Sequence, residues 1–218
     1  MESYFFDRHD AGRQLAKALL AYGGRNDVLV LALPRGGVPV GYEVATALGA
    51  DFDILIVRKL GVPYHPELAM GAIASGGALY LNPSVIRNAG VSQAQIDQVM
   101  ATEREELIRR ETLYRGTRAP AEINDKTVIL VDDGIATGAS MHAAVMALRS
   151  NRPARIVVAV PVSPAEAAGR FADDADAFIS VLSPEDFYAV GQFYTRFDQT
   201  SDDEVRELLT RFHGEASS

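Results

Sequence analysis

The chain has 218 residues and a formal net charge of −8, and 48% of its residues are hydrophobic. These values are typical of a globular protein, and the length suits one α/β domain with additions. The acidic balance argues against general nucleic-acid binding, because such binding depends on lysine and arginine side chains that neutralise phosphates. The absence of cysteine excludes a disulfide framework, a thiolate metal site and a thiol nucleophile.

The N-terminal sequence MESYFFDRHD has no cationic segment followed by an apolar run, so it does not indicate a signal peptide. No apolar run approaches the roughly 20 residues that a membrane-spanning helix needs. We therefore expect a cytoplasmic protein without a membrane partner.

Apolar patterns predict helices that alternate with short buried strands along the chain. The strands are expected at residues 28–33, 53–57, 128–131, 156–160 and 177–182. The helices are expected at residues 11–22, 40–48, 83–89, 93–114, 141–149, 164–171 and 202–212. This alternation predicts a central parallel sheet flanked by helices, with ligands bound beyond the carboxyl ends of the strands.

The segment between the second and third of these strands follows other patterns. Residues 60–69 contain two prolines and a glycine and are predicted to form a loop, and residues 71–81 are predicted to form a hairpin. Ser92 and Gln95 form a capping-box pattern at the start of the longest helix. Its charged run, residues 103–111, is expected to be a solvated face.

The stretch from Val128 to Ser140, VILVDDGIATGAS, joins a buried strand to two carboxylates and a loop of small and hydroxyl residues. Because a helix follows, its N-terminal N–H groups can bind a phosphate, while Asp132 and Asp133 face sugar hydroxyls or a metal ion. Two other strand ends carry Arg35-Gly36-Gly37 and Arg58-Lys59. We expect these cations to hold a second, larger anion at the same sheet edge.

The stretch VILVDDGIATGAS resembles the motif that binds phosphoribosyl diphosphate (PRPP) in type I phosphoribosyltransferases. Residues 33–37, LPRGG, resemble the pyrophosphate loop of that family, and Arg58-Lys59 with the loop after them resemble its catalytic loop. The three matches fall in the family's order and spacing, so the resemblance covers residues 27–182.

This resemblance implies the type I phosphoribosyltransferase fold in one domain spanning residues 1–218. It also implies a helical insertion at residues 82–119 and a small hood made by residues 184–218 together with the N-terminus. A homodimer is expected on the same ground.

The resemblance also assigns roles to the selected residues. Asp132 and Asp133 would bind the ribose hydroxyls, directly or through Mg²⁺, and the loop up to Ser140 would bind the 5-phosphate. Arg35-Gly36, where the family often has a cis peptide bond, would bind pyrophosphate through its backbone. The residues expected to bind PRPP are Arg35, Gly36, Gly37, Asp132, Asp133, Ala136, Thr137, Gly138, Ala139 and Ser140. The residues expected to be catalytic are Arg58, Lys59 and Asp133, with the two cations stabilising the leaving pyrophosphate.

The acceptor half of the site departs from the familiar pattern. Enzymes that salvage purines often have an aspartate just before the Thr-Gly of the motif, where this chain has Ala136. The strand after the motif ends without the lysine that contacts a 6-oxo group in those enzymes, so a 6-oxopurine acceptor is disfavoured. The aromatic segment 184–197 resembles their acceptor-binding segment, which implies that Tyr188 stacks on the acceptor beside Phe187 and Val190. For the two aromatic rings, simple packing is an equally open interpretation.

The sequence therefore predicts a Mg²⁺-dependent phosphoribosyltransferase of nucleotide metabolism. It would transfer the 5-phosphoribosyl group from PRPP to a nitrogenous acceptor and release pyrophosphate. A PRPP-sensing regulator with the same fold is the alternative. A phosphosugar hydrolase with Asp132 as nucleophile would need a Thr/Ser and Lys set that is absent at the required spacings. Whether His65 and Glu67, in the loop predicted after Arg58-Lys59, take part in catalysis stays open.

Overall fold

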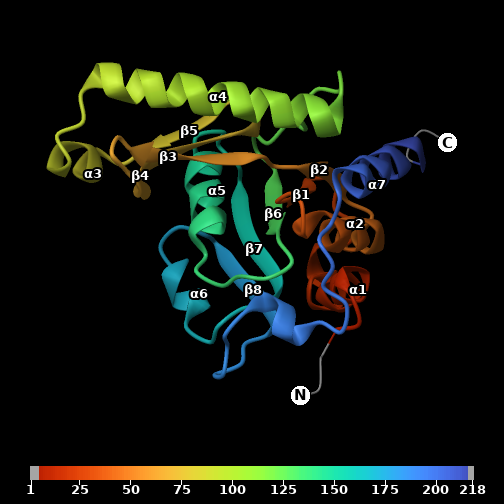
Figure 1. Cartoon of the computed structure of the whole chain (residues 1–218). Coiled ribbons are helices and arrows are strands. Elements are labelled where there is room, and N and C mark those ends of the chain that lie inside the picture. Colours follow the sequence, from red (N-terminus) through yellow and green to blue (C-terminus); the bar gives the residue numbers. More distant parts are fainter. Residues whose placement is uncertain (1–4, 216–218) are drawn as a thin grey trace.

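The computed structural model describes residues 5–215 and contains two sheets. The main sheet has five parallel strands in the order β2-β1-β6-β7-β8, and a smaller antiparallel sheet has the order β3-β4-β5. Figure 1 shows the small sheet lying between the main sheet and the long helix α4. The main sheet and its flanking helices confirm the predicted α/β class.

The elements follow one another closely along the chain. The strands of the main sheet are β1 (Val28–Ala32), β2 (Asp51–Ile54), β6 (Thr127–Val131), β7 (Arg155–Val162) and β8 (Ala177–Leu182). Those of the small sheet are β3 (Val57–Val62), β4 (His65–Ala74) and β5 (Ala78–Leu81). The α-helices are α1 (Arg8–Ala18), α2 (Gly37–Leu48), α3 (Pro83–Asn88), α4 (Gln93–Arg115), α5 (Ala139–Arg149), α6 (Ala167–Arg170) and α7 (Asp202–Glu215). Short 3₁₀ turns lie at Leu20–Tyr22, Ser75–Gly77 and Val190–Phe193.

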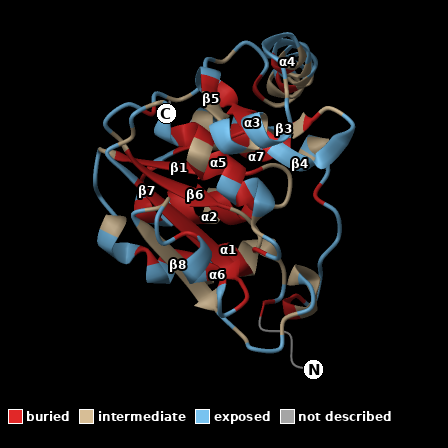
Figure 2. Ribbon diagram, turned by 90° about the vertical axis from the view of Figure 1, so that its left-hand side faces the viewer, coloured by how far each residue is buried: buried red, intermediate tan, exposed pale blue. Residues whose placement is uncertain are grey.

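The central strands of the main sheet are continuous runs of buried apolar residues, as expected for a parallel sheet that is covered on both faces. Successive residues alternate between the faces: Val30 packs with α1, α2 and α7, whereas Leu31 and Leu130 pack with α5. Figure 2 shows these strands as a buried layer between helices with exposed outer surfaces. Parallel pairing sets Ala32 beside Val131, so the loops after β1 and β6 emerge next to each other.

The prediction of a loop at residues 60–69 is wrong. Most of these residues belong to β3 and β4, an antiparallel pair whose register shifts on either side of Gly61. A Cβ built on Gly61 would lie 2.7 Å from the Pro66 carbonyl oxygen, so only glycine allows this approach of the strands. The irregular register accommodates residues that usually break strands. The hairpin predicted at 71–81 is confirmed by β4, β5 and the turn between them.

Two other predicted elements have different boundaries. The strand expected at 53–57 is divided, because β2 ends at Ile54 and β3 begins at Val57 in the other sheet. Arg58 and Lys59 therefore lie inside a strand of the small sheet, not beyond the end of a parallel strand. Helix α6 covers only part of the predicted 164–171. Within residues 5–215, no helix has the length and apolarity needed to cross a membrane.

Candidate functional site

Two loops meet at the carboxyl end of the main sheet, one after β1 and one after β6. A Cβ built on Gly36 would lie 2.1 Å from Oδ2 of Asp133, and one built on Gly37 would lie 2.8 Å from the carbonyl oxygen of Val131. These glycines are therefore required for contact between the loops, a reason that the sequence alone did not provide. The peptide bond between Pro34 and Arg35 is cis.

Asp132 and Asp133 lie directly after β6 and are partly buried. Oδ1 of Asp132 accepts a hydrogen bond from the backbone N–H of Asp133 at 2.8 Å. Burial and the neighbouring Asp133 carboxylate raise the pKa of Asp132 well above its ordinary value. Burial also raises the pKa of Asp133, although Arg8 opposes that shift. A cation or a hydroxyl donor would stabilise the ionised pair, as expected for a binding site.

Arg8, in the first turn of α1, contacts this acidic pair and was not selected from the sequence. Its Nε donates to Oδ2 of Asp133 at 2.8 Å. From the C-terminal side, the hydroxyl of Tyr194 donates to the carbonyl oxygen of Asp133 at 2.5 Å. Segments near both ends of the chain therefore contact the motif.

The loop between β6 and α5 presents the predicted phosphate-binding residues to solvent. Ala136, Thr137, Ala139 and Ser140 are exposed. Gly138 is the N-cap of α5 with a left-handed φ of 79° and offers no side chain to cap the helix, although Thr137 Oγ1 accepts a hydrogen bond from the backbone N–H of Ala139 at 3.4 Å. The N–H of Ala139 therefore has a weak partner in Thr137, and the N–H groups that follow it in the first turn are available to an anion.

A pocket of about 470 Å³ opens beside this loop. Arg35, Arg58, Lys59 and Ser140 line it, so the structure brings together residues that the sequence placed at three separate strand ends. Another wall is formed by α4, with two arginines and a tyrosine. Sequence reasoning missed this wall, because a charged helix face is usually solvated.

Two cations of the pocket are already paired with carboxylates. Arg58 Nε donates to Oε2 of Glu103 on α4 at 2.6 Å. Arg35 lies 3.6 Å from Oδ1 of Asp202, the first residue of α7. The solvated face predicted at residues 103–111 is exposed at Arg104, Glu105 and Arg109, but Glu103 binds a cation of the pocket.

The predicted acceptor residues lie in the C-terminal segment, outside the lining of this pocket. Phe187 stacks on Phe193 with ring centroids 5.5 Å apart and an interplanar angle of 22°. Val190 packs on Gly134 of the motif, where an added Cβ would lie 2.6 Å from Val190 Cγ1. Tyr188 is 85% exposed. Packing therefore engages the ring of Phe187, whereas the ring of Tyr188 is accessible to a ligand.

Two further candidates, His65 and Glu67, are exposed in the first half of β4 and do not line the pocket. For metal binding, residues 5–215 contain no group of three or more His, Cys, Asp or Glu side chains placed around one position. The acidic pair alone supplies two carboxylates. Magnesium ions commonly bind one or two carboxylates and take their other ligands from substrate and water.

Residues 7–197 match the family model described as a phosphoribosyl transferase domain. The chain belongs to the phosphoribosyltransferase family. A Mycobacterium tuberculosis protein, Rv0571c, with a provisional phosphoribosyl transferase name, is 47% identical over 209 residues, which are 96% of this chain and 47% of that protein. The chain thus spans about half the length of these curated relatives.

Two other relatives of this phosphoribosyltransferase chain differ in sequence identity and in the share of the chain that they match. The crystal structure of TT1426 from Thermus thermophilus has 42% sequence identity and a TM-score of 0.86, and the match covers 95% of this chain and 98% of that chain. The bifunctional protein PyrR of Chloroflexus aurantiacus is 31% identical over 129 residues, which are 58% of this chain and 65% of that protein. Together with the five-stranded parallel sheet, these matches confirm the type I phosphoribosyltransferase fold.

Proposed function

We propose that the protein transfers the 5-phosphoribosyl group from PRPP to a nitrogenous acceptor, with Mg²⁺ as cofactor and pyrophosphate as product. The observation that carries this proposal is the contact between the loops after β1 and β6. It joins an acidic pair, an open helix N-terminus and a cationic pocket at one sheet edge. PRPP carries the complementary groups: two adjacent ribose hydroxyls, a 5-phosphate and a diphosphate.

The sugar half of PRPP is proposed to bind at the motif. Backbone N–H groups of residues 136–140, with the hydroxyls of Thr137 and Ser140, would hold the 5-phosphate at the N-terminus of α5. The two ribose hydroxyls would donate to Asp132 and Asp133. Hydroxyl donors favour ionised carboxylates, so they would oppose the raised pKa values of this pair.

Magnesium fits the same two carboxylates, because it prefers oxygen ligands and commonly shares them with substrate and water. Asp132 and Asp133 would hold it together with oxygens of PRPP. When bound, the ion would stabilise the negative charge of the diphosphate as that group leaves.

The diphosphate is proposed to bind in the pocket between Arg35, Arg58 and Lys59. Displacement at the anomeric carbon breaks the bond to the diphosphate oxygen, so positive charge develops on the sugar ring and negative charge on the leaving group. Cationic side chains aimed at that leaving group stabilise the transition state more than the ground state. Arg58, Lys59 and Asp133 are therefore the proposed catalytic residues.

The acceptor is proposed to approach from the side of Val190, which packs on Gly134 of the motif. Tyr188 is the aromatic ring that remains accessible for stacking, because Phe187 is engaged with Phe193. Ala136 supplies no carboxylate for a purine nitrogen, so the proposal names a nitrogenous acceptor without the usual 6-oxopurine contacts.

A PRPP-sensing regulator is the second candidate. It is favoured by the ion pair between Arg8 and Asp133, because this pair connects the ligand site to α1, and Arg8 also donates to the carbonyl oxygen of Asp198. A ligand that displaced Arg8 would change the packing of both terminal segments. Such a sensor needs PRPP binding but no acceptor.

Measurement of pyrophosphate release with PRPP and Mg²⁺, across nucleobases and small amines, separates the two candidates. We expect at least one acceptor to raise the release rate above the rate with PRPP alone, and Lys59→Ala to lower it. If the protein binds PRPP but no acceptor raises the rate, the sensor is favoured and the transferase is contradicted.

The proposal also includes a single domain with a hood at residues 184–218, a cytoplasmic location and a homodimer. Sedimentation analysis of the purified protein tests the dimer, which predicts a mass of twice that of one chain.

A further inference from the structure

Helix α4 forms a wall of the cationic pocket that belongs to none of the motifs identified from the sequence. Arg109, Arg110, Leu113 and Tyr114 line the pocket from this helix, opposite the loop after β1 and strand β3. The spacing of Glu103, Arg110 and Tyr114, at seven and then four residues, keeps these side chains on one helical face. That face therefore borders the anion site, and its two arginines remain open to solvent, with side chains 63% exposed at Arg109 and 41% exposed at Arg110.

The two arginines of this wall are held in place by one carboxylate. Glu106 Oε2 accepts from Arg109 Nε at 2.7 Å, and its Oε1 accepts from Arg110 Nε at 2.7 Å. These contacts lower the pKa of Glu106 to about 2, with the hydrogen bond from Arg109 as the largest cause. Glu106 therefore stays ionised at neutral pH and orients both guanidinium groups. Their remaining N–H donors are available to a ligand, because each guanidinium carries five.

Contacts at three points fix α4 relative to the pocket. Glu103 binds Arg58 of β3. The hydroxyl of Tyr114 donates to Oδ1 of Asp202 at 2.6 Å, and the same oxygen lies 3.6 Å from Arg35. Burial, together with this hydrogen bond, raises the pKa of Tyr114 to about 12, so its hydroxyl remains protonated and continues to donate.

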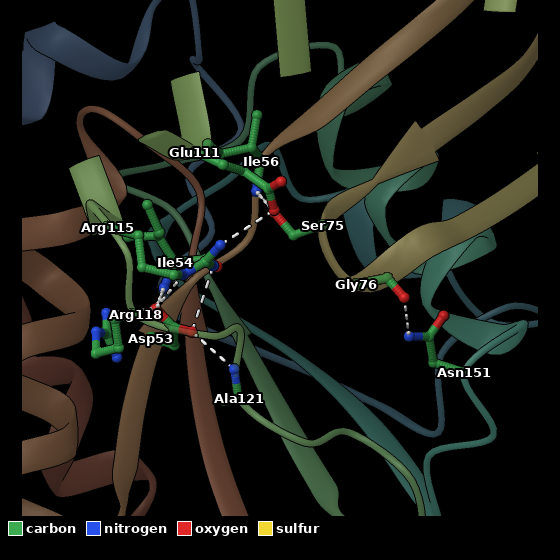
Figure 3. A network of polar contacts seen from close by, with 10 residues as sticks. All are labelled: Asp53, Ile54, Ile56, Ser75, Gly76, Glu111, Arg115, Arg118, Ala121 and Asn151. Atoms are coloured by element: carbon green, nitrogen blue, oxygen red, sulfur yellow. Dashed lines mark hydrogen bonds and ion pairs between the residues drawn. The ribbon is translucent and has the colours of Figure 1, made fainter. Parts of the chain in front are cut away.

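The third contact lies at the end of α4 and is buried. Arg115 Nε donates to Asp53 Oδ1 at 3.3 Å, and its Nη2 donates to the carbonyl oxygen of Ile54 at 2.8 Å (Figure 3). The side chains of Arg115 and Asp53 are only 2% and 1% exposed. A buried ion pair tolerates little displacement, so it fixes the rotation of the helix and thereby the direction of its pocket face.

The charge of the pocket points to its ligand. Five cationic side chains line it, three from β1–α2 and β3 and two from α4, whereas the carboxylates that contact them are Asp202, Glu103 and Glu106. This excess of positive charge occurs in a chain whose net charge is −8. A local positive field in an acidic protein concentrates anions. The pocket volume of about 470 Å³ accommodates a group larger than one phosphate.

We propose that Arg109 and Arg110 are binding residues for a diphosphate, either free pyrophosphate or the diphosphate group of the sugar donor. This inference rests on the proposed function for the identity of the donor, but not for the binding of pyrophosphate itself. It makes the helical segment 93–115 a functional wall of the site, in addition to Arg35, Arg58 and Lys59.

Calorimetric titration with inorganic pyrophosphate tests this proposal on the full chain. The double variant Arg109→Gln/Arg110→Gln should bind roughly ten-fold more weakly or worse, because two charge-assisted hydrogen-bonding groups are removed. Arg104→Gln is the matched control, because Arg104 is an exposed arginine of the same helix that does not line the pocket. Its affinity should stay within about two-fold of the unmodified protein, since a distant exposed charge contributes little.

The conservative double variant Arg109→Lys/Arg110→Lys should recover part of the lost affinity, because the charge is restored without the planar fork. Equal affinity of the Gln double variant and Arg104→Gln, with unchanged helix content, would overturn the proposal, as would a lack of pyrophosphate binding to the unmodified protein. If pyrophosphate binding depends on these arginines but PRPP does not bind, this inference stands and the proposed function fails. If the Gln double variant binds pyrophosphate and uses PRPP normally, this inference fails and the proposed function stands.

Discussion

The guanidinium of Arg8 donates from Nε to Oδ2 of Asp133 at 2.8 Å, across 125 residues of sequence. The two side chains are only 12% and 15% exposed. Arg8 is itself held by the C-terminal segment, because it donates to the carbonyl oxygen of Asp198 at 2.6 Å and lies 4.0 Å from the ring centre of Phe197. The acidic pair of the motif is thus neutralised in part by Arg8, the first residue of α1.

Replacing this arginine should destabilise the protein strongly. Arg8→Leu would leave the Asp133 carboxylate buried without its cation, which costs about 3 kcal/mol of unfolding free energy. Arg13→Leu on the same helix is the control, because Arg13 is 55% exposed and makes only long ion pairs. It should cost less than about 1 kcal/mol. Urea unfolding at pH 7 measures both, and equal losses for the two variants would contradict a buried role for Arg8.

Arg8 shows where sequence reasoning stops. The strand, the carboxylates and the helix of Val128–Ser140 could be predicted because each depends on neighbouring residues. The partner of Asp133 depends on how α1 packs on the sheet, and an arginine in the first turn of a helix has no local signal that separates it from a solvated one. The requirement for glycine at Gly36 has the same origin, since the obstructing atom belongs to Asp133.

Gly36→Ala should therefore be more harmful than an ordinary helix-terminus substitution. The backbone of Gly36 is right-handed helical (φ −60°), so alanine is allowed there, but its Cβ would meet the Asp133 carboxylate. We expect a loss of roughly 1–3 kcal/mol from overpacking, together with weaker PRPP binding. Gly169→Ala in α6 is the control, because nothing lies within 4 Å of its added Cβ. Thermal unfolding of both variants checks this, and the account is wrong here if Gly36→Ala is as stable as Gly169→Ala.

The raised pKa of Asp132 predicts that the acidic pair limits stability at neutral pH. The ordinary pKa of this carboxyl is 3.8, and its folded-state pKa is well above that value. Between these values the folded state binds more protons than the unfolded state, so stability falls as pH rises through the window. The substitution Asp132→Asn removes this dependence and keeps an oxygen acceptor for the N–H of Asp133.

The Asp132→Asn variant should accordingly be more stable than the unmodified protein at pH 7, and the difference should shrink toward zero near about pH 3. Unfolding experiments across this pH range measure the difference. A stability gap that stays constant with pH, or that favours the unmodified protein at pH 7, would contradict the environment described for Asp132.

The network around Asp53 predicts a further stability effect. Asp53 accepts from Arg115, from Arg118 at 2.9 Å and from the backbone N–H of Ala121 at 2.9 Å (Figure 3). Arg115→Met removes a buried partner and should cost about 3 kcal/mol. Arg25→Met breaks an exposed pair with Asp27 and should cost less than about 1 kcal/mol. Denaturant titrations compare the two, and a similar small loss for both would show that the buried pair does not anchor α4.

The pairing of β3 with β4 in the small sheet and the contacts of α4 could not be predicted from the sequence either. Proline and glycine usually end strands and so favour a loop at residues 60–69, but pairing of β3 with β4 supplies hydrogen bonds that the local pattern does not show. The pairing of Glu103 with Arg58 could not be predicted, because the two residues lie in different elements and are distant in sequence. Both features depend on residues whose environment is created by tertiary contacts.

The central claim is that the acidic pair and the loop after it bind the ribose phosphate of PRPP, and a titration with PRPP and Mg²⁺ tests it most directly. The unmodified protein should bind PRPP, and Asp133→Asn should bind it at least about ten-fold more weakly, because a charged acceptor for a ribose hydroxyl is lost. Asp173→Asn, which changes an exposed aspartate outside the pocket lining, should bind like the unmodified protein. Unchanged affinity in Asp133→Asn, or no binding to the unmodified protein, would contradict the account.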